Sequence, residues 1–172
     1  NLVSALYLRK QISYSENTIY PYGELADLRP DVIARVRKMA LLQSENHPWG
    51  AMSDLDLLRS AQLYKKDFQT GKDGFTLAAI LLVGKDETIL SVVPHFRIDA
   101  ILRRDNIDRY DDRDDIRTNL IESYDRLLRF GEKHLNDPFY LENDQRISLR
   151  GHILREVISN ILIHREYANA FP

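Results

Sequence analysis

The feature that most constrains the fold is a run of ten residues, FTLAAILLVG, at positions 75–84. The run is almost continuously apolar, has the length of a strand, and ends at a glycine. A strand with one face in water would alternate apolar and polar residues, whereas a strand covered on both faces is apolar throughout. The sequence therefore predicts a buried central strand here.

Shorter patterns on either side of this run predict further strands. Residues 2–11 alternate loosely between apolar and polar side chains, and residues 18–20 form a short β-prone segment that Pro21 ends. Residues 96–102 place Phe, Ile, Ala and Leu at every second position, as a half-buried strand does. The polar segment at 65–74 is expected to be a loop.

Helices are predicted where caps and periodicity agree. Pro30 is in the position of the first residue of a helix over residues 30–43, and Ser53 resembles the cap of a second helix. A long helix is expected from Asp115 to about Leu135, followed by two short strands and a last helix. These elements predict an α+β fold, a small mixed sheet with packed helices, as a fragment of a multidomain protein.

Composition limits where such a protein works and what its surface binds. Lys and Arg number 24 against 26 Asp and Glu, which gives a net charge of −2. Proteins whose whole surface binds a phosphate backbone are usually clearly basic, so nucleic-acid contact is expected to be local or to lie elsewhere in the protein. The absence of Cys removes disulfides and thiolate metal sites and fits a cytoplasmic location. No long apolar run indicates a membrane span.

Two arginine-rich segments bear on nucleic-acid binding. Residues 97–117 hold six Arg and seven Asp, so their charges cancel and a solvated, salt-bridged surface is the better interpretation. Near the helix at 30–43, four basic residues less Asp31 give a local charge of +3. Direct DNA binding through this basic helix is one hypothesis, and a solvated helix face is the other. The four residues are Arg29, Arg35, Arg37 and Lys38.

The last predicted helix carries polar residues within an apolar sequence. In REVISNILIHREY, residues 155–167, the side chains of Glu156, Asn160 and His164 recur at every fourth position among Val, Ile and Leu. Residues four apart lie on one side of a helix, about 6 Å apart along its axis. If they are buried they need partners, so one interpretation pairs Glu156 with an arginine or a backbone N–H, and Asn160 with a strand. The other interpretation is a binding site.

Two kinds of binding site fit this spacing unequally. A zinc site is disfavoured because His152 and His164 would lie about 18 Å apart along the helix, whereas Zn–N bonds are about 2 Å long. A nucleotide-phosphate site fits better, since the amide oxygen of Asn160 suits Mg²⁺ and the carboxylate of Glu156 can act as a general base. The spacing alone is common, so the pattern does not decide between the site and a core helix.

The same segment resembles a known family. LREVISNILIHREY is similar to the opening of the divergent GHKL-type ATPase domain in bacterial RecG-like or Schlafen AlbA-like transcriptional regulators, whose pattern is Arg-Glu-x-x-x-Asn-x-x-x-His-Arg-Asp-Tyr. Glu166 stands where the pattern has Asp. FTLAAILLVGKDE also resembles an upstream segment of these proteins, and ALYLRKQISYSENTIY resembles the end of their AlbA-like domain. The positions that match are Arg155, Glu156, Asn160, His164, Arg165 and Tyr167.

The resemblance implies the central fragment of an ATP-binding transcriptional regulator. It implies Glu156 as general base, Asn160 as Mg²⁺ ligand, and His164 and Arg165 as further nucleotide contacts. ATP and Mg²⁺ are then the cofactors of the full-length parent, a possible ATPase whose partner is DNA, and the fragment alone is expected to bind neither cofactor. The implied parts are the end of an AlbA-like nucleic-acid-binding domain at 1–22, a connecting helix at 23–52, an α+β linking unit at 53–110, and the truncated start of the ATPase domain at 111–172.

Two further expectations complete this picture. No stretch matches the phosphate loop G-x-x-x-x-G-K-[ST], so a helicase motor is not supported. The alternative to a nucleotide-dependent regulator is a non-catalytic interaction module, which includes a homodimer, in which the last helix is ordinary core.

Overall fold

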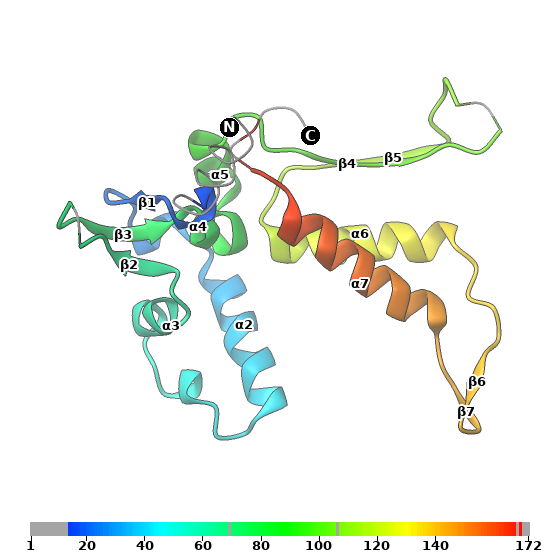
Figure 1. The fold of residues 1–172 in the computed structure, drawn as a ribbon, viewed down its shortest axis with the longest axis horizontal. Helices are drawn as coiled ribbons and strands as arrows, with labels where there is room; N and C mark the ends of the chain where they lie inside the picture. The colour runs from blue at the N-terminus through cyan, green and yellow to red at the C-terminus, as the bar shows by residue number, and fades with distance from the viewer. Residues whose placement is uncertain (1–13, 69, 106, 168, 170–172) are drawn as a thin grey trace, which may run out of the picture.

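The computed structural model describes residues 14–68, 70–105, 107–167 and 169. Helices and small antiparallel sheets alternate along the chain, which confirms the predicted α+β class (Figure 1). The strand predicted at 2–11 lies outside the described residues. Within the described part of the chain, no helix combines the length and apolar character that crossing a membrane requires.

The first sheet has three antiparallel strands in the order β1-β3-β2. Strand β3 (Asp73–Thr76) lies in the middle, and its Phe75 is opposite both Tyr20 of β1 (Ile19–Tyr20) and Tyr64 of β2 (Tyr64–Lys66). The segment predicted as a loop therefore forms parts of two paired strands, and that prediction was wrong at both ends of the segment. Gly71 supplies the left-handed turn between them, with φ of +73°.

The apolar run at 75–84 is buried, as expected, but it forms helix α4 (Leu77–Val83) rather than a central strand. Thr76 caps this helix, because its Oγ1 accepts a hydrogen bond from the N–H of Ala79 at 3.2 Å. Leu and Ala are good helix formers, and a short helix can be apolar on every side when every side is covered. The buried residues of α4 are Leu77, Ala79, Ile80, Leu81 and Val83.

Helices on the N-terminal side of α4 follow the predicted caps. Helix α2 spans Pro30–Gln43, as predicted, and α3 spans Asp54–Ser60 after the capping residue Ser53. Short 3₁₀ turns connect these elements, namely η1 (Ser15–Asn17), η2 (Leu25–Asp27) and η3 (Pro48–Gly50).

On the C-terminal side, the predicted boundaries needed two corrections. Helix α5 (Asp86–Val92) was not predicted, and the residues expected to open a long helix form strand β5 (Asp112–Ile116). Strand β5 pairs with β4 (Ile98–Leu102) in a hairpin that extends away from the rest of the molecule (Figure 1). Helix α6 therefore begins only at Leu120 and runs to His134.

Ion pairs cover this hairpin, as its balanced charges predicted. Asp99 of β4 bonds two arginine side chains, those of Arg97 and Arg113. Asp112 of β5 bonds Lys133 of α6, and that hydrogen bond holds the pKa of Asp112 below its usual range. The aspartates thus hold the arginine-rich segment to itself and to α6.

The chain then forms a small hairpin and the last helix. The two short strands predicted here are β6 (Leu141–Glu142) and β7 (Gln145–Arg146), which flank a two-residue turn, and α7 spans Leu149–His164. Figure 1 shows α6 and α7 packed together on one side of the molecule, α2 and α3 on the other, and α4 between them.

Helix α4 joins two hydrophobic cores. The first core lies between α2, α3 and α4, and consists of Leu28, Val32, Ile33, Leu57, Leu58, Phe75, Ala79 and Val83. The second lies between α4, α5, the β4–β5 hairpin and α7, and consists of Leu77, Ile80, Leu81, Ile89, Val93, Phe96, Ile98, Ile116, Ile158, Leu162 and Tyr167. Opposite faces of α4 thus hold the two halves of the protein together.

Candidate functional site

Local sequence fixes how α7 is oriented. Ser148 caps the helix, because its Oγ accepts a hydrogen bond from the N–H of Gly151 at 3.0 Å. The inner face buries Ile158 and Leu162, and Leu154 packs against Gly131 of α6. A Cβ added at Gly131 would lie 2.8 Å from Cδ2 of Leu154, so a glycine is needed for this close approach. The opposite face of α7 is therefore directed outward.

The polar stripe predicted on this helix lies on that outward face. Glu156 and Asn160 are both exposed, and Nδ2 of Asn160 donates a hydrogen bond to Oε1 of Glu156 at 3.0 Å. Neither side chain makes another hydrogen bond or ion pair to a described residue. His164, one turn farther on, is also exposed. The structure thus brings the carboxylate and the amide together in an accessible position, without the core partners that the alternative interpretation required.

An apolar stripe runs beside the polar one. Ile153, Val157 and Ile161 follow one another at intervals of four residues and are exposed to 60%, 45% and 57%. A helix that is apolar on nearly every side is normally covered on every side. The described residues cover only the inner face of α7, so its outer face has the character of a contact surface.

Arg165, which the resemblance predicts to contact the nucleotide, is engaged within the protein. Its Nη1 donates to the backbone carbonyl of Arg97 at 2.6 Å, and its guanidinium lies 5.3 Å from the centre of the Tyr167 ring. This places it on the hairpin side of the helix end, so its contact with a ligand stays a prediction. Arg165 instead holds the end of α7 against the segment that enters β4.

Tyr167 completes this anchor. It is buried, its hydroxyl donates to the carbonyl of Leu162 at 2.8 Å, and its ring stacks on Phe96 with centroids 5.9 Å apart. Burial raises the pKa of Tyr167 to about 12. The matching motif thus has two structural parts, an accessible stripe at Glu156 and Asn160 and a buried anchor after the helix.

The predicted DNA-binding residues on and beside α2 lie among acidic and carbonyl partners. Arg29 binds Asp31 and, at 3.1 Å, Glu122 of α6, while Arg35 forms two hydrogen bonds with Asp125. Arg37 donates to the carbonyls of Trp49 and Met52 and to Asp54, and Lys38 is exposed. The three arginines therefore serve to hold α2 to its neighbours, and DNA contact through them stays a hypothesis.

Metal binding by protein groups alone has no support in the described ranges. Among these residues, no three His, Asp or Glu side chains are grouped so that they could hold a metal ion. An ion beside Asn160 would therefore need most of its ligands from a bound molecule and from water.

Sequence reasoning missed a cavity of about 710 Å³, which lies on the side of α7 next to the polar stripe of Glu156 and Asn160. Ser159 and Ile163 of α7 line it, together with residues of α2, η3, α4 and α6. The only signal in the sequence was that Val36 and Met39 continue the apolar side of α2 beyond its buried first turn.

Comparison with known proteins identifies the class of this chain. Residues 5–99 match the family described as a domain of unknown function, DUF8451, and because the match spans more than half of the chain, the chain belongs to that family. No curated protein and no solved structure matches it. The matched region ends within β4, so it includes the whole of the first core, between α2, α3 and α4, and excludes α6 and α7.

Proposed function

We propose that α7 forms one wall of a nucleotide-phosphate site in an ATP-binding transcriptional regulator of the AlbA-like and GHKL-like kind. One observation carries the proposal: Glu156 and Asn160 are exposed, aligned and bonded only to each other among the described residues. Because both side chains are exposed on a largely apolar helix and neither is bonded to the core, both are available to a ligand.

The donor set fits a nucleotide-bound Mg²⁺. Because Nδ2 of Asn160 donates to Glu156, its Oδ1 is left to face a cation, and Mg²⁺ takes oxygen ligands and is commonly held by one or two protein groups plus phosphates and water. The second carboxylate oxygen of Glu156 is free to accept a proton from a water molecule. Asn160 would hold the ion, Glu156 would orient the water, and His164 would contact the phosphates.

The fold offers a route by which such a site would affect the rest of the protein. Leu162, in the last turn of α7, and Tyr167, three residues after the helix, belong to the second core. That core also contains residues of α4, which lies in the DUF8451 region. In the proposed regulator, nucleotide binding at α7 is communicated through α4 towards a nucleic-acid-binding domain that precedes this unit.

A binding titration of the full-length protein tests the proposal. With labelled ATP and Mg²⁺, Asn160→Ala is expected to weaken binding about tenfold or more, because a ligand of the ion is lost. Glu156→Gln is expected to keep binding and lose hydrolysis if the parent is an ATPase. Asn46→Ala, which removes an exposed amide from the loop after α2, is the matched control. ATP affinity that Asn160→Ala leaves unchanged would contradict the proposal.

A second candidate function is a homodimerisation module, and the exposed stripe of Ile153, Val157 and Ile161 favours it. Two copies of α7 packed together would bury this stripe. Val157→Lys places a charge at its centre and is expected to convert a dimer to a monomer in sedimentation analysis. A sedimenting mass that corresponds to a monomer for the unaltered protein at micromolar concentration would remove this candidate.

A further inference from the structure

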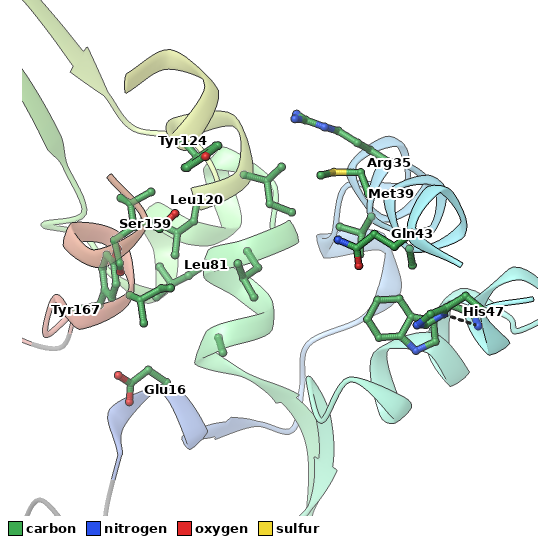
Figure 2. A pocket seen from close by; sticks show the side chains of 18 residues that line it. Glu16, Arg35, Met39, Gln43, His47, Leu81, Leu120, Tyr124, Ser159 and Tyr167 are labelled. Carbon is green, nitrogen blue, oxygen red and sulfur yellow. Dashed lines mark hydrogen bonds between the residues drawn. The ribbon is translucent and has the colours of Figure 1, made fainter. Parts of the chain in front are cut away.

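The cavity beside α7 has a mainly apolar lining. Its volume of about 710 Å³ lies within the range of roughly 300–1,000 Å³ that is typical of small-molecule sites. Figure 2 shows the lining in two groups, with Arg35, Met39, Gln43 and His47 on one side and Leu81, Leu120, Tyr124, Ser159 and Tyr167 on the other. The cavity therefore lies between the two halves of the protein that α4 joins.

The two charged side chains in the cavity lining, Arg35 and Glu16, differ in whether they have an ionic partner. Arg35 is compensated, because two of its nitrogens bond the two carboxylate oxygens of Asp125, and this hydrogen bonding lowers the pKa of Asp125. Glu16 lies at one end of the cavity (Figure 2), is partly buried, and makes no hydrogen bond or ion pair to a described residue. Among the described residues that line the cavity, Glu16 is thus the charged side chain with no ionic partner in the described part of the chain, and its charge is negative.

Aromatic rings supply the second feature. Trp49, Tyr124 and Tyr167 all line the cavity, and Tyr167 lies on the same side as Glu16 (Figure 2). The faces of such rings attract cations, most strongly where water is excluded. The ring of Tyr167 already stacks on Phe96 and lies beside the guanidinium of Arg165, so Trp49 and Tyr124 are the rings left to contact a bound cation. Most of the remaining wall is apolar, with Met39, Leu82 and Ile163 among its members, and Gln43, His47 and Ser159 are its polar residues. An apolar body and a positive charge are the two properties that this lining complements.

We propose that this cavity binds a bulky hydrophobic organic cation, with its apolar body between α2 and α7 and its positive charge towards Glu16. A hydrophobic anion would bring its charge to Glu16 or to an arginine that Asp125 already compensates. A neutral apolar segment of another protein would cover the carboxylate of Glu16 without compensating it, which is unfavourable. The inference does not depend on the proposed nucleotide site.

A pair of probes of nearly equal size and opposite charge tests this. Trp49, the only tryptophan of the chain, lines the cavity, so its fluorescence reports occupancy directly. Tetraphenylphosphonium is expected to quench it and to bind about tenfold more tightly than tetraphenylborate. Glu16→Gln is expected to abolish this preference, whereas Glu45→Gln, which alters an exposed glutamate that does not line the cavity, is expected to preserve it.

A second variant keeps the test independent of Glu16. Met39→Lys adds a positive charge at a half-exposed position of the lining, so it is expected to lower the phosphonium affinity about tenfold and to raise that of the borate. Equal affinity of the two probes, or a preference that survives Glu16→Gln, would overturn the proposal. So would the failure of tetraphenylphosphonium to change Trp49 fluorescence in the unaltered protein.

Discussion

Helices α6 and α7 pack against each other, yet their outer surfaces differ in kind. Four charged residues of α6 are bonded to other segments of the chain, through the pairs Glu122–Arg29, Asp125–Arg35, Arg126–Asp114 and Lys133–Asp112. The outer face of α7 carries the exposed stripe of Ile153, Val157 and Ile161, and there Glu156 and Asn160 are hydrogen-bonded to each other and to no other described residue. The charged side chains of α6 are thus mostly paired within the protein, whereas the outer face of α7 is open to further contacts.

The difference separates two uses of polar residues. On α6 they fix the positions of α2 and the β4–β5 hairpin, so they contribute to the architecture. On α7, Arg150 likewise bonds the end of α6, whereas Glu156 and Asn160 lie in the middle of an apolar face and, among the described residues, bond only each other. A helix with this composition is normally buried. We infer that α7 is the element through which this protein meets a ligand, a partner or a further domain.

The largest expected effect contrasts the two faces of α7. Ile158 is 6% exposed and belongs to the core, so Ile158→Ala is expected to lower the free energy of unfolding by about 2–4 kcal/mol. Ile161→Ala, on the outer face, is expected to change it by less than about 0.5 kcal/mol. Urea unfolding followed by circular dichroism measures both. A loss of stability at Ile161 comparable to that at Ile158 would show that the outer face is already covered.

An intermediate effect contrasts the caps of the two helices. Asn119 is fully buried, and its side chain accepts from the N–H of Glu122 at 3.0 Å and donates to the carboxylate of Glu122 at 2.9 Å. Asn119→Ala is expected to cost about 2 kcal/mol, since it removes the cap and leaves buried groups without partners. Ser148→Ala, at the partly exposed cap of α7, is expected to cost about 1 kcal/mol. If Asn119→Ala and Ser148→Ala lowered the free energy of unfolding by the same amount, the cap of α6 would be no more important for stability than the cap of α7.

Sequence reasoning predicted α2 to the residue because its signals are local. Pro30 marks the first turn, and the apolar spacing continues to Gln43. The prediction of a strand at residues 75–84 was wrong because a short apolar segment has no periodicity that separates a strand from a buried helix. Leu and Ala favour the helix, and the segment forms α4. Strand β5 was missed because its acidic residues are stabilised by partners distant in the sequence, such as Arg126 and Lys133.

The candidate site also has features that the sequence predicts and features that it does not. The alignment of Glu156 and Asn160 follows from helix geometry and was predictable from their spacing. Their exposure was not predictable, because it depends on which face of α7 packs against α6, and that choice rests on the contact between Gly131 and Leu154. The cavity was also beyond prediction, since its walls come from segments far apart in the chain.

The smallest expected effect tests the architectural role of the α6 charges. Hydrogen bonds from Arg35 hold the pKa of Asp125 below its usual range. A carboxyl group whose pKa is lower in the folded state stabilises the protein above the unfolded pKa, about 3.9, and this contribution is lost as the pH falls towards the folded value. Both side chains are partly exposed, so Asp125→Asn is expected to cost about 1 kcal/mol or less at pH 7.

A double-mutant cycle with Arg35→Gln and Asp125→Asn isolates this interaction from other effects of the two substitutions. Their coupling energy, measured by urea unfolding, is expected to be favourable at pH 7, smaller at high salt, and close to zero once the pH lies below the lowered pKa of Asp125. A coupling energy that stays constant across this range would mean that the pair is held by geometry and not by charge. Packing, and not charge pairing, would then fix the side chains on the surface of α6. The difference between α6 and α7 would consist only of the exposed apolar stripe on α7.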